Sequence, residues 1–377
     1  MFGAYLDCNA TAPLEPAVKD TLIRYFADEV GNSGSRTHEY GIRANRAVEE
    51  ARERVASVVK VKPDEVVFTS GATESDNIAL LGIADYGRKT GRNHIVSSEI
   101  EHKAVLEPLD MLERQGFEIT LVKPNRGGRI EVEAIEAEVR TDTLLVSVMH
   151  VNNETGVLQP INEIAEMLGN YDAYFHTDAA QGFGKSISEL CNDRIDLISV
   201  SSHKIYGPVG VGALVIRKRG FKRPPVNPLV FGGGQERGLR PGTIPVALVA
   251  GFGLAAEIAE YTWFERRSRC IEIRESALEA LGGLGIYLHG DQDHVLPHVV
   301  NFSVPKVESE AVMLSLKGLA AVSNGSACTS QSYTPSHVLK AMELSDDEIN
   351  GAVRLSWCHL TDDIDWSQIA SRIGSLM

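Results

Sequence analysis

The chain contains the stretch Ser199-Val-Ser-Ser-His-Lys-Ile-Tyr-Gly-Pro208, which joins the end of an apolar run to a histidine, a lysine and a turn. Residues 196–202 have the composition of a buried strand, and Gly207 and Pro208 break the chain soon afterwards. We therefore expect Lys204 at the carboxyl end of a strand. Ligand sites in open α/β sheets lie at that edge. Lys204 is thus a candidate functional residue, although most lysines are solvated surface charges.

Apolar strand patterns alternate with amphipathic helix patterns along the first two thirds of the chain. Strands are expected at residues 65–69, 93–98 and 144–150, and helices at residues 44–59 and 247–267. Such alternation is typical of a mainly parallel sheet covered by helices on both faces. The sequence therefore predicts an α/β fold.

A second, smaller domain is expected in the last third of the chain. The pattern changes after the helical run, with a strand at residues 298–303 and further helices to the end. We assign residues 15–255 to a large domain, and residues 1–14 together with residues 256–377 to a small α+β domain. A chain of 377 residues with 43% hydrophobic content is long enough to bury both cores.

An acid and an amide follow another apolar run, Tyr174-Phe-His-Thr-Asp-Ala-Ala-Gln181, and are expected at the same sheet edge as Lys204. Pyridoxal phosphate requires a lysine that forms a Schiff base with its aldehyde and an acid beside its pyridine nitrogen. A carboxylate keeps this nitrogen protonated, so that the ring accepts electrons from the Cα atom of the substrate. Asp178 and Lys204 are therefore a candidate cofactor pair.

A phosphate site is expected where Val66-Val-Phe-Thr-Ser-Gly-Ala-Thr-Glu-Ser-Asp-Asn77 passes from a strand through a glycine turn into a helix. Backbone N–H groups at a helix N-terminus bind anions through their unpaired donors and the helix dipole. Taken alone, such a segment is more often an ordinary N-cap. This segment follows a strand of the same predicted sheet as Lys204 and Asp178, which favours its interpretation as a phosphate site.

Charge, cysteine content and hydropathy limit the class of protein. The net charge of −14 argues against direct binding of nucleic acid by this chain. Five cysteines without paired spacing are typical of reduced thiols in a cytosolic protein. The first residues lack a signal pattern, and the longest apolar tract, residues 243–256, is too short to span a bilayer. We expect a cytoplasmic protein without a membrane segment or a bound metal.

Nine ordered blocks of the sequence carry a family resemblance. They are Tyr5-Leu-Asp-Cys-Asn-Ala-Thr-Ala12, Gly31-Asn-Ser-Gly-Ser-Arg-Thr-His38, Thr69-Ser-Gly-Ala-Thr-Glu-Ser-Asp-Asn77, Glu99-Ile-Glu-His-Lys-Ala-Val105, His150-Val-Asn-Asn-Glu-Thr-Gly156, His176-Thr-Asp-Ala-Ala-Gln181, Ser201-Ser-His-Lys204, Gly232-Gly-Gly-Gln-Glu-Arg-Gly-Leu-Arg240 and Ser323-Asn-Gly-Ser-Ala-Cys-Thr-Ser330. These blocks resemble the cysteine desulfurases of the class V aminotransferase group, the NifS/IscS-like enzymes. The resemblance implies the fold type I architecture of pyridoxal phosphate-dependent transferases, with a seven-stranded, mainly parallel sheet, and an obligate homodimer.

The resemblance also implies roles for residues around the cofactor ring. Lys204 matches the lysine that binds pyridoxal phosphate, Asp178 the partner of its pyridine nitrogen, and His102 the imidazole that stacks on the ring and relays protons. Gln181 and Asn153 match residues beside the phenolic oxygen, and Asn153 also borders the substrate. Taken alone, His102 is equally compatible with a capping or surface histidine.

Other matched residues are implied to hold the phosphate and the substrate. The phosphate contacts within one subunit are Ala72, Thr73, Ser201 and His203. Thr243 matches a residue that reaches the phosphate from the second subunit. Arg354 matches the arginine that holds the substrate carboxylate, a bidentate task that suits a guanidinium. The alternative for Arg354 is a strand arginine whose charged end reaches solvent.

Cys328 differs from the other cysteines because it lies in a small, polar stretch, Asn324-Gly-Ser-Ala-Cys-Thr-Ser-Gln-Ser332, where a thiol is expected to be exposed and mobile. The resemblance implies that its thiolate attacks the substrate sulfur, so that L-cysteine yields L-alanine and a persulfide on Cys328. The longer type of loop implies that the sulfur passes to an acceptor protein. We expect Cys191 and Cys270 to be inert.

Two departures from the family pattern bear on the chemistry and the pathway. Trp357-Cys-His359 replaces the usual apolar residue, glycine and basic residue, and places Cys358 four positions after Arg354. We expect Cys358 to be a bystander. The block Gly31-Asn-Ser-Gly-Ser-Arg-Thr-His38 resembles the DndA-type desulfurases of bacterial DNA phosphorothioation. We therefore expect sulfur supply to DNA phosphorothioation, with iron–sulfur cluster and thiocofactor supply as the alternative.

Two other functions are compatible with the residues. One is a pyridoxal phosphate aminotransferase or β-lyase in which Cys328 is incidental, and retained activity in Cys328→Ser favours it. The other is a cofactor-bearing scaffold that holds a partner, and a failure to turn over any amino acid favours that function.

Overall fold

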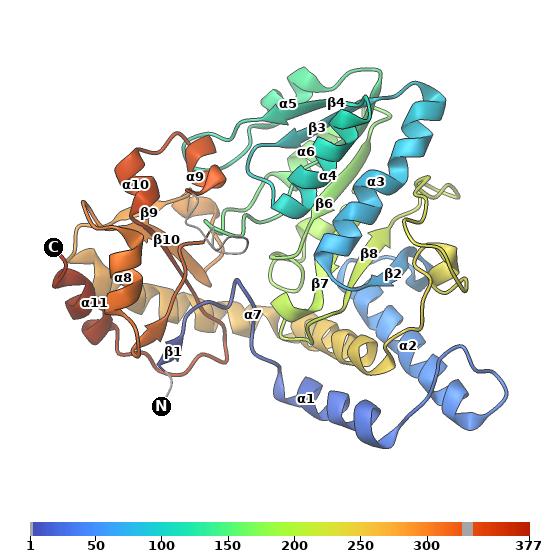
Figure 1. Cartoon of the computed structure of the whole chain (residues 1–377), viewed down its shortest axis with the longest axis horizontal. Coiled ribbons are helices and arrows are strands. Elements are labelled where there is room, and N and C mark those ends of the chain that lie inside the picture. Colours follow the sequence, from blue (N-terminus) through green and yellow to red (C-terminus); the bar gives the residue numbers. More distant parts are fainter. Residues whose placement is uncertain (1–2, 326–334) are drawn as a thin grey trace.

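The computed structural model describes residues 3–325 and 335–377, and Figure 1 shows two groups of elements joined by one long helix. Within the described residues, the larger group contains a sheet of seven strands and the smaller group contains a sheet of three strands. The long helix, α7 (Val246–Gly282), passes along both groups and connects them.

The larger sheet has the strand order β2-β8-β7-β6-β5-β3-β4. Its strands are β2 (Val66–Thr69), β3 (His94–Ser98), β4 (Glu118–Val122), β5 (Thr143–Ser147), β6 (Tyr174–Asp178), β7 (Leu197–Ser201) and β8 (Gly212–Ile216). Only β8 runs antiparallel to its neighbours. The prediction of a mainly parallel sheet in an α/β fold is therefore confirmed.

Helices cover both faces of this sheet, because its strands are apolar on both sides. They are α1 (Pro16–Ile23), α2 (Glu39–Val58), α3 (Ala72–Thr90), α4 (Lys103–Arg114), α5 (Val132–Glu138), α6 (Ile161–Leu168) and the first part of α7. On one face, α3 and α4 pack through residues such as Ile83 and Leu109 against Leu145. On the other face, α2, α6 and α7 supply Val55, Ile164 and their neighbours. The sheet is thus the middle layer of three.

The smaller group has a hydrophobic core of its own. Strand β10 (Val299–Ser303) pairs antiparallel with β9 (Tyr287–His289) and β12 (Ala352–Ser356), and β1 (Ala4–Tyr5) pairs with β11 (Ala320–Ala321). Its helices are α8 (Ser309–Ser315), α9 (His337–Ala341), α10 (Asp346–Asn350) and α11 (Trp366–Gly374). Short helical turns complete the described chain: η1 (Arg24–Asp28), η2 (Pro63–Glu65), η3 (Glu189–Cys191), η4 (Ser202–Lys204), η5 (Glu236–Gly238) and η6 (Gln292–His294).

Helix α7 extends well beyond residue 267, where its apolar pattern was expected to end. Cys270, Ile273, Ala277 and Leu281 continue one buried stripe at helical spacing into the core of the smaller group. We propose the domain division expected from the sequence, with residues 15–255 in the large domain, although the helix continues through that boundary. By length and composition alone α7 could span a membrane, but half of its apolar window is buried inside the fold, as in a core helix.

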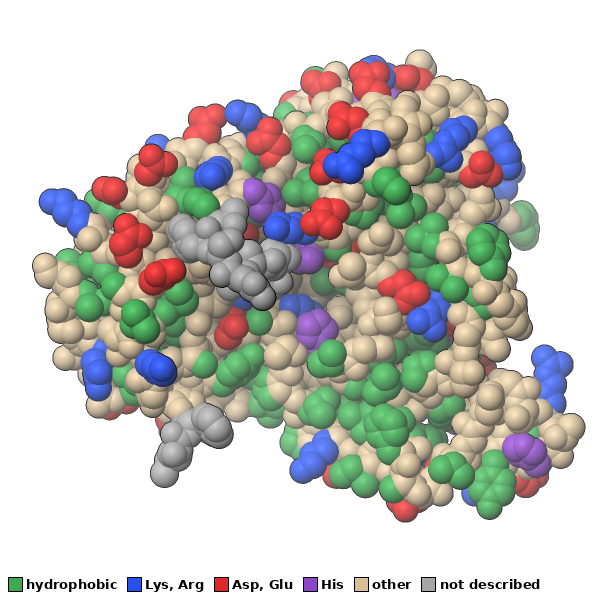
Figure 2. Space-filling view, viewed as in Figure 1, with side chains coloured by type: hydrophobic (Ala, Val, Ile, Leu, Met, Phe, Trp, Pro, Cys, Tyr) green, Lys and Arg blue, Asp and Glu red, His purple; other side chains and the backbone are tan. Residues whose placement is uncertain are grey.

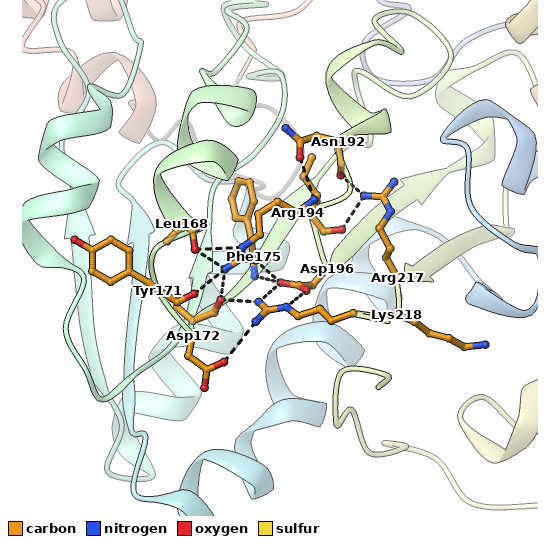
Figure 3. A network of polar contacts seen from close by, with 12 residues as sticks. Leu168, Tyr171, Asp172, Phe175, Asn192, Arg194, Asp196, Arg217 and Lys218 are labelled. Carbon is orange, nitrogen blue, oxygen red and sulfur yellow. Dashed lines mark hydrogen bonds and ion pairs between the residues drawn. The ribbon is translucent and has the colours of Figure 1, made fainter. Parts of the chain in front are cut away.

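The strand that leads to Lys204 is fixed at its start by a buried carboxylate (Figure 3). Asp196, directly before β7, accepts hydrogen bonds from Phe175 N at 2.7 Å and from Arg194 Nη1 at 2.9 Å. The guanidinium of Arg219 binds the same carboxylate through Nε at 2.6 Å and Nη2 at 2.7 Å. These contacts set the position of β7 relative to β6, and so the relative positions of the residues at the ends of both strands.

We expect Asp196→Asn to lower the midpoint of thermal unfolding by about 5 °C or more, because breaking a buried ion pair costs about 3–5 kcal/mol. The matched control is Asp172→Asn. Asp172 pairs with Arg92 and also with Arg219, but its side chain is 88% exposed, so the expected loss is below about 1 kcal/mol. Equal melting of the two variants, measured by circular dichroism, would contradict this account.

Candidate functional site

A cavity of about 390 Å³ lies at the carboxyl end of the larger sheet. Among the residues that line it are Asn9, Ala72, Thr73, Asp76, His102, Asn153, Asp178, Gln181, Ser201, His203, Lys204 and Arg354. On the face shown in Figure 2, the surface is hollowed between the two groups, and histidine, lysine and arginine side chains gather along the hollow. All the expected cofactor and substrate residues except Thr243 and Cys328 therefore meet in one place.

Lys204 ends the short helical turn η4, which follows β7 at the sheet edge. Its Nζ atom donates to the backbone oxygens of Asn9 and Ala10, the latter at 2.7 Å. Both acceptors belong to the N-terminal segment, which crosses from the smaller group to the larger one. The amine is thus held in the cavity by backbone carbonyl groups.

Asp178 is the last residue of β6, and the cavity contains a second buried carboxyl beside it. Oδ1 of Asp178 accepts from Ala180 N at 2.9 Å. Burial raises the pKa of Asp178 to about 7, and repulsion from Asp76 adds to the shift. Burial also raises the pKa of Asp76 to about 7, and neither of its oxygens has a hydrogen-bond partner among the described residues. A positively charged group of a ligand bound in the cavity would favour the ionised forms of Asp178 and Asp76.

His102 caps a helix, as one of the two interpretations expected, and it also lines the cavity. It is the N-cap of α4, where its Nδ1 atom accepts from Ala104 N at 3.1 Å, and its ring also lines the cavity. Because Nδ1 accepts a hydrogen bond, the neutral ring carries its proton on Nε2. Burial lowers the pKa of His102, which favours this neutral form. The cap therefore fixes both the orientation and the tautomer of the imidazole.

The cavity is lined on one side by the start of α3, where backbone donors are free of intrahelical partners. Gly71, with φ +155°, is the N-cap, and Ala72 and Thr73 follow it in the first turn. A Cβ atom on Gly212 would lie 2.7 Å from Gly71 Cα, so glycine is required for this close approach. Ser201 and His203 line the same side. This cradle suits a phosphate group.

His203 is neutral at this side of the cavity. Its Nδ1 atom lies 3.0 Å from Thr11 Oγ1. Burial and the neighbouring Lys204 charge lower the pKa of His203 to about 4. Thr243 is exposed and lies outside the described lining of the cavity, so it does not reach the phosphate side of its own chain.

Arg354 projects from β12 into the cavity and is only 2% exposed. Its Nη1 donates to Asn153 O at 2.9 Å and its Nη2 to Asp7 Oδ1 at 2.7 Å, while Nε has no partner in the described part of the chain. The alternative of a strand arginine that reaches solvent is therefore wrong. Sequence reasoning gave no role to Asp7, although this residue stands in the first matched block.

Gln181 and Asn9 carry amide groups that are only partly satisfied. Gln181 Nε2 donates to Asn9 O at 3.0 Å, and Asn9 Nδ2 donates to Asn153 O at 3.1 Å. The side-chain oxygens of Gln181 and Asn9 are buried without a partner within residues 3–325 and 335–377. Buried polar atoms of this kind normally have partners, so they are consistent with a polar ligand. The anion cradle, the amine, the acids and these amides together fit pyridoxal phosphate.

Cys328 lies outside the described residues. Gly325 and Pro335, which flank the segment that contains it, line a second cavity of about 600 Å³. This cavity shares His102 and Asn153 with the first one. In the described chain, no group of three or more histidine, cysteine or acidic residues is arranged to hold a metal ion.

Known proteins resemble this chain over nearly its whole length, in sequence and in fold. The model of the aminotransferase class-V family matches residues 4–366. The cysteine desulfurase IscS of Vibrio cholerae is 42% identical over 364 residues, which is 96% of this chain and 89% of the relative. DndA from Streptomyces lividans is 50% identical, with a TM-score of 0.83 over 94% of this chain and 99% of that structure. A NifS-like protein is 34% identical, with a TM-score of 0.91 over 100% and 99% of the two chains.

Proposed function

The chain belongs to the class-V aminotransferase family and is a cysteine desulfurase that uses pyridoxal phosphate, and we propose that it delivers the sulfur of L-cysteine through Cys328 to an acceptor protein. One observation carries this proposal. A lysine that follows β7, a buried acid at the end of β6 and a buried arginine from β12, namely Lys204, Asp178 and Arg354, line one cavity beside an anion cradle.

Different residues of the cavity would carry out different parts of the reaction. When bound, pyridoxal phosphate supplies an aldehyde for the substrate amine and a ring that accepts electrons from Cα. Lys204 would hold the cofactor and then remove the Cα proton through Nζ. Asp178 would balance the charge of the pyridine nitrogen, and His102 would present its Nε2 proton to the reacting groups. Burial lowers the pKa of His102, which favours the neutral imidazole that this role requires.

Sulfur transfer would require a thiolate at Cys328. Its sulfur attacks the sulfur of the substrate, so that an S–S bond forms while the Cβ–S bond breaks. The electron pair of the broken bond stays with the carbon skeleton, which is protonated and leaves as L-alanine. The product on the protein is a persulfide at Cys328.

Arg354 would hold the substrate carboxylate, and we expect Arg354→Lys to raise KM for L-cysteine about 10- to 100-fold with little change in kcat. An ammonium loses one of the two parallel hydrogen bonds of a guanidinium, worth about 1.5–3 kcal/mol. The control is Arg129→Lys, which alters an arginine paired with Glu163 outside the cavity. Steady-state kinetics should leave the control unchanged. An unchanged KM for L-cysteine in Arg354→Lys would show that Arg354 does not hold the substrate carboxylate.

A homodimer would complete the phosphate site. Thr243 is exposed, as expected for a residue that contacts another subunit. Large apolar side chains are also exposed on the larger group, at Phe26, Tyr40, Val209 and Phe231. Exposed apolar patches often mark protein interfaces. We propose that this surface joins two copies of the chain. We also propose that the protein is cytoplasmic, where it would meet L-cysteine and the acceptor protein.

The proposed pathway is sulfur supply to DNA phosphorothioation, and it is supported by 50% identity to DndA against 42–43% to IscS relatives. Iron–sulfur cluster supply is the second candidate, favoured by the 96% coverage of the IscS match. We expect ³⁵S from labelled L-cysteine to reach the phosphorothioation enzyme at least about tenfold faster than an iron–sulfur scaffold, when both compete. Faster labelling of the scaffold would reverse the assignment. Desulfurase activity itself does not depend on this outcome.

A further inference from the structure

Two cysteines from opposite ends of the chain, Cys8 and Cys358, lie together in the protein interior. Cys8, which follows β1 in the N-terminal segment, and Cys358, which lies two residues beyond the end of β12, belong to one buried cluster with Ala12 and Tyr206. Their side chains are 2% and 1% exposed. Both lie outside the described lining of the substrate cavity, so they form a thiol pair separate from that cavity.

Backbone contacts fix the two cysteines relative to each other. Asp7 and Ser356 form a parallel β-bridge, and Cys8 N donates to Ser356 O at 3.1 Å. The next residue, Asn9, donates its N–H to Ser356 Oγ at 2.9 Å. Three consecutive residues of the N-terminal segment are thus attached to one residue of β12. The two thiols are held side by side by these contacts rather than by chance packing of mobile loops.

The environment of Cys358 favours its thiolate. The Thr361 hydroxyl lies 3.7 Å from Cys358 Sγ and also accepts from Cys358 N at 2.9 Å. Hydrogen bonding from the neighbouring Cys8 thiol lowers the pKa of Cys358 to about 6, while the pKa of Cys8 is raised by the same contact. The hydrogen bond between the two thiols thus makes one of them the more acidic group, an arrangement that suits a resolving reaction.

A separate cavity of about 470 Å³ reaches the pair through Cys8. Cys8 lines this cavity together with Tyr5, Pro13 and the segment from Leu360 to Asp363, whereas Cys358 is buried beyond its described lining. A small oxidant can reach Cys8 here without passing through the substrate cavity, whose described lining shares none of these residues.

We propose that Cys8 and Cys358 are a disulfide-forming pair, oxidised by hydrogen peroxide that enters through this second cavity. One thiolate of the pair attacks one peroxide oxygen, the O–O bond breaks, and with one proton the products are a sulfenic acid and water. The other thiol then attacks the sulfenic sulfur and a second water leaves. Two thiols lose two electrons in total, and hydrogen peroxide is reduced to two waters. A dithiol reductant reverses the reaction.

The disulfide would act on the active site through the N-terminal strap, which we define as residues 7–12. Asp7 binds Arg354, the backbone oxygens of Asn9 and Ala10 accept from Lys204, and Ala12 N donates to the backbone of the turn that carries this lysine. A bond between Cys8 and Cys358 would hold the neighbouring Asp7 on Arg354. The substrate carboxylate needs the same guanidinium, so oxidation weakens substrate binding.

The test uses the holoenzyme with Cys328→Ser, so that the catalytic thiol does not compete for the oxidant. After treatment with equimolar hydrogen peroxide, alkylation and digestion without reductant, mass spectrometry should find a Cys8 peptide linked to a Cys358 peptide. Dithiothreitol should release it. Adding Cys270→Ser, the neighbouring buried thiol on α7, should leave the link intact, whereas adding Cys8→Ala should abolish it.

Two outcomes would overturn the pairing: both cysteines still fully alkylated after the treatment, or Cys358 linked to Cys270. The first would show that the two cysteines are only core packing, and the second that Cys358 reacts with a different partner. Binding of L-cysteine to the same holoenzyme, followed by the absorbance of the cofactor, tests the consequence. Oxidation should weaken binding about fivefold or more, and the Cys8→Ala protein should show no change. Equal binding by the oxidised and reduced proteins would overturn the link to the active site.

Discussion

Lys204→Ala is expected to abolish the formation of alanine and sulfide from L-cysteine, lowering kcat by about a thousandfold or more. The amine of Lys204 is the one that the cavity holds between the sheet edge and the N-terminal strap. Its loss removes both the covalent attachment of the cofactor and the base for the Cα proton. The cofactor absorbance at visible wavelengths and the turnover should disappear together.

The control for this prediction is Lys185→Met. Lys185 is also partly buried, and its amine lies 3.2 Å from His298 Nε2, but it stands outside the described lining of the substrate cavity. The variant should keep the cofactor absorbance and most of the turnover. Turnover by Lys204→Ala at more than about a tenth of the wild-type rate would show that another lysine binds the cofactor.

Cys328→Ser is expected to lower sulfide release by about a thousandfold while leaving cofactor binding and the affinity for L-cysteine unchanged. A serine hydroxyl has a far higher pKa than a thiol and is a poor nucleophile toward sulfur. The loss should therefore be confined to the transfer step. Sulfide and alanine assays, together with absorbance titration with L-cysteine, separate the two effects.

The matched controls are Cys191→Ser and Cys270→Ser, which alter a half-buried and a buried thiol away from the cavity. Both should turn over L-cysteine at nearly the wild-type rate. If Cys328→Ser still released sulfide at that rate, a β-lyase reaction without a persulfide would replace the proposal. In that case the family and the cofactor of the chain would be unaffected, whereas the proposed role of the Cys328 segment in sulfur transfer would be wrong.

The residues at the strand ends could be predicted from the sequence because their local pattern is unambiguous. An apolar run that ends in Asp178, or in Ser201 followed by Lys204, fixes both the strand and the edge at which its last side chain appears. The reversed direction of β8 carries no such signal, because an apolar strand reads the same in both directions. Helix α7 was underestimated because its second half is amphipathic and its buried stripe is narrow.

The contacts of the N-terminal strap were missed for a physical reason. Asn9 and Ala10 bind Lys204 through backbone oxygens, which every residue possesses, so the side chains give no sign of the contact. Asp76 and Asp7 resemble ordinary polar residues near a helix start and a strand end. Only the fold shows that one is fully buried in the cavity and that the other holds Arg354.

The most direct test of sulfur transfer is the mass of the Cys328 peptide after the holoenzyme is incubated with L-cysteine in the absence of a reductant and of an acceptor. The account predicts that this peptide gains the mass of one sulfur atom, that dithiothreitol removes it, and that one alanine is formed for each sulfur gained. An unmodified Cys328 peptide in a sample that has produced alanine and free sulfide would contradict the account.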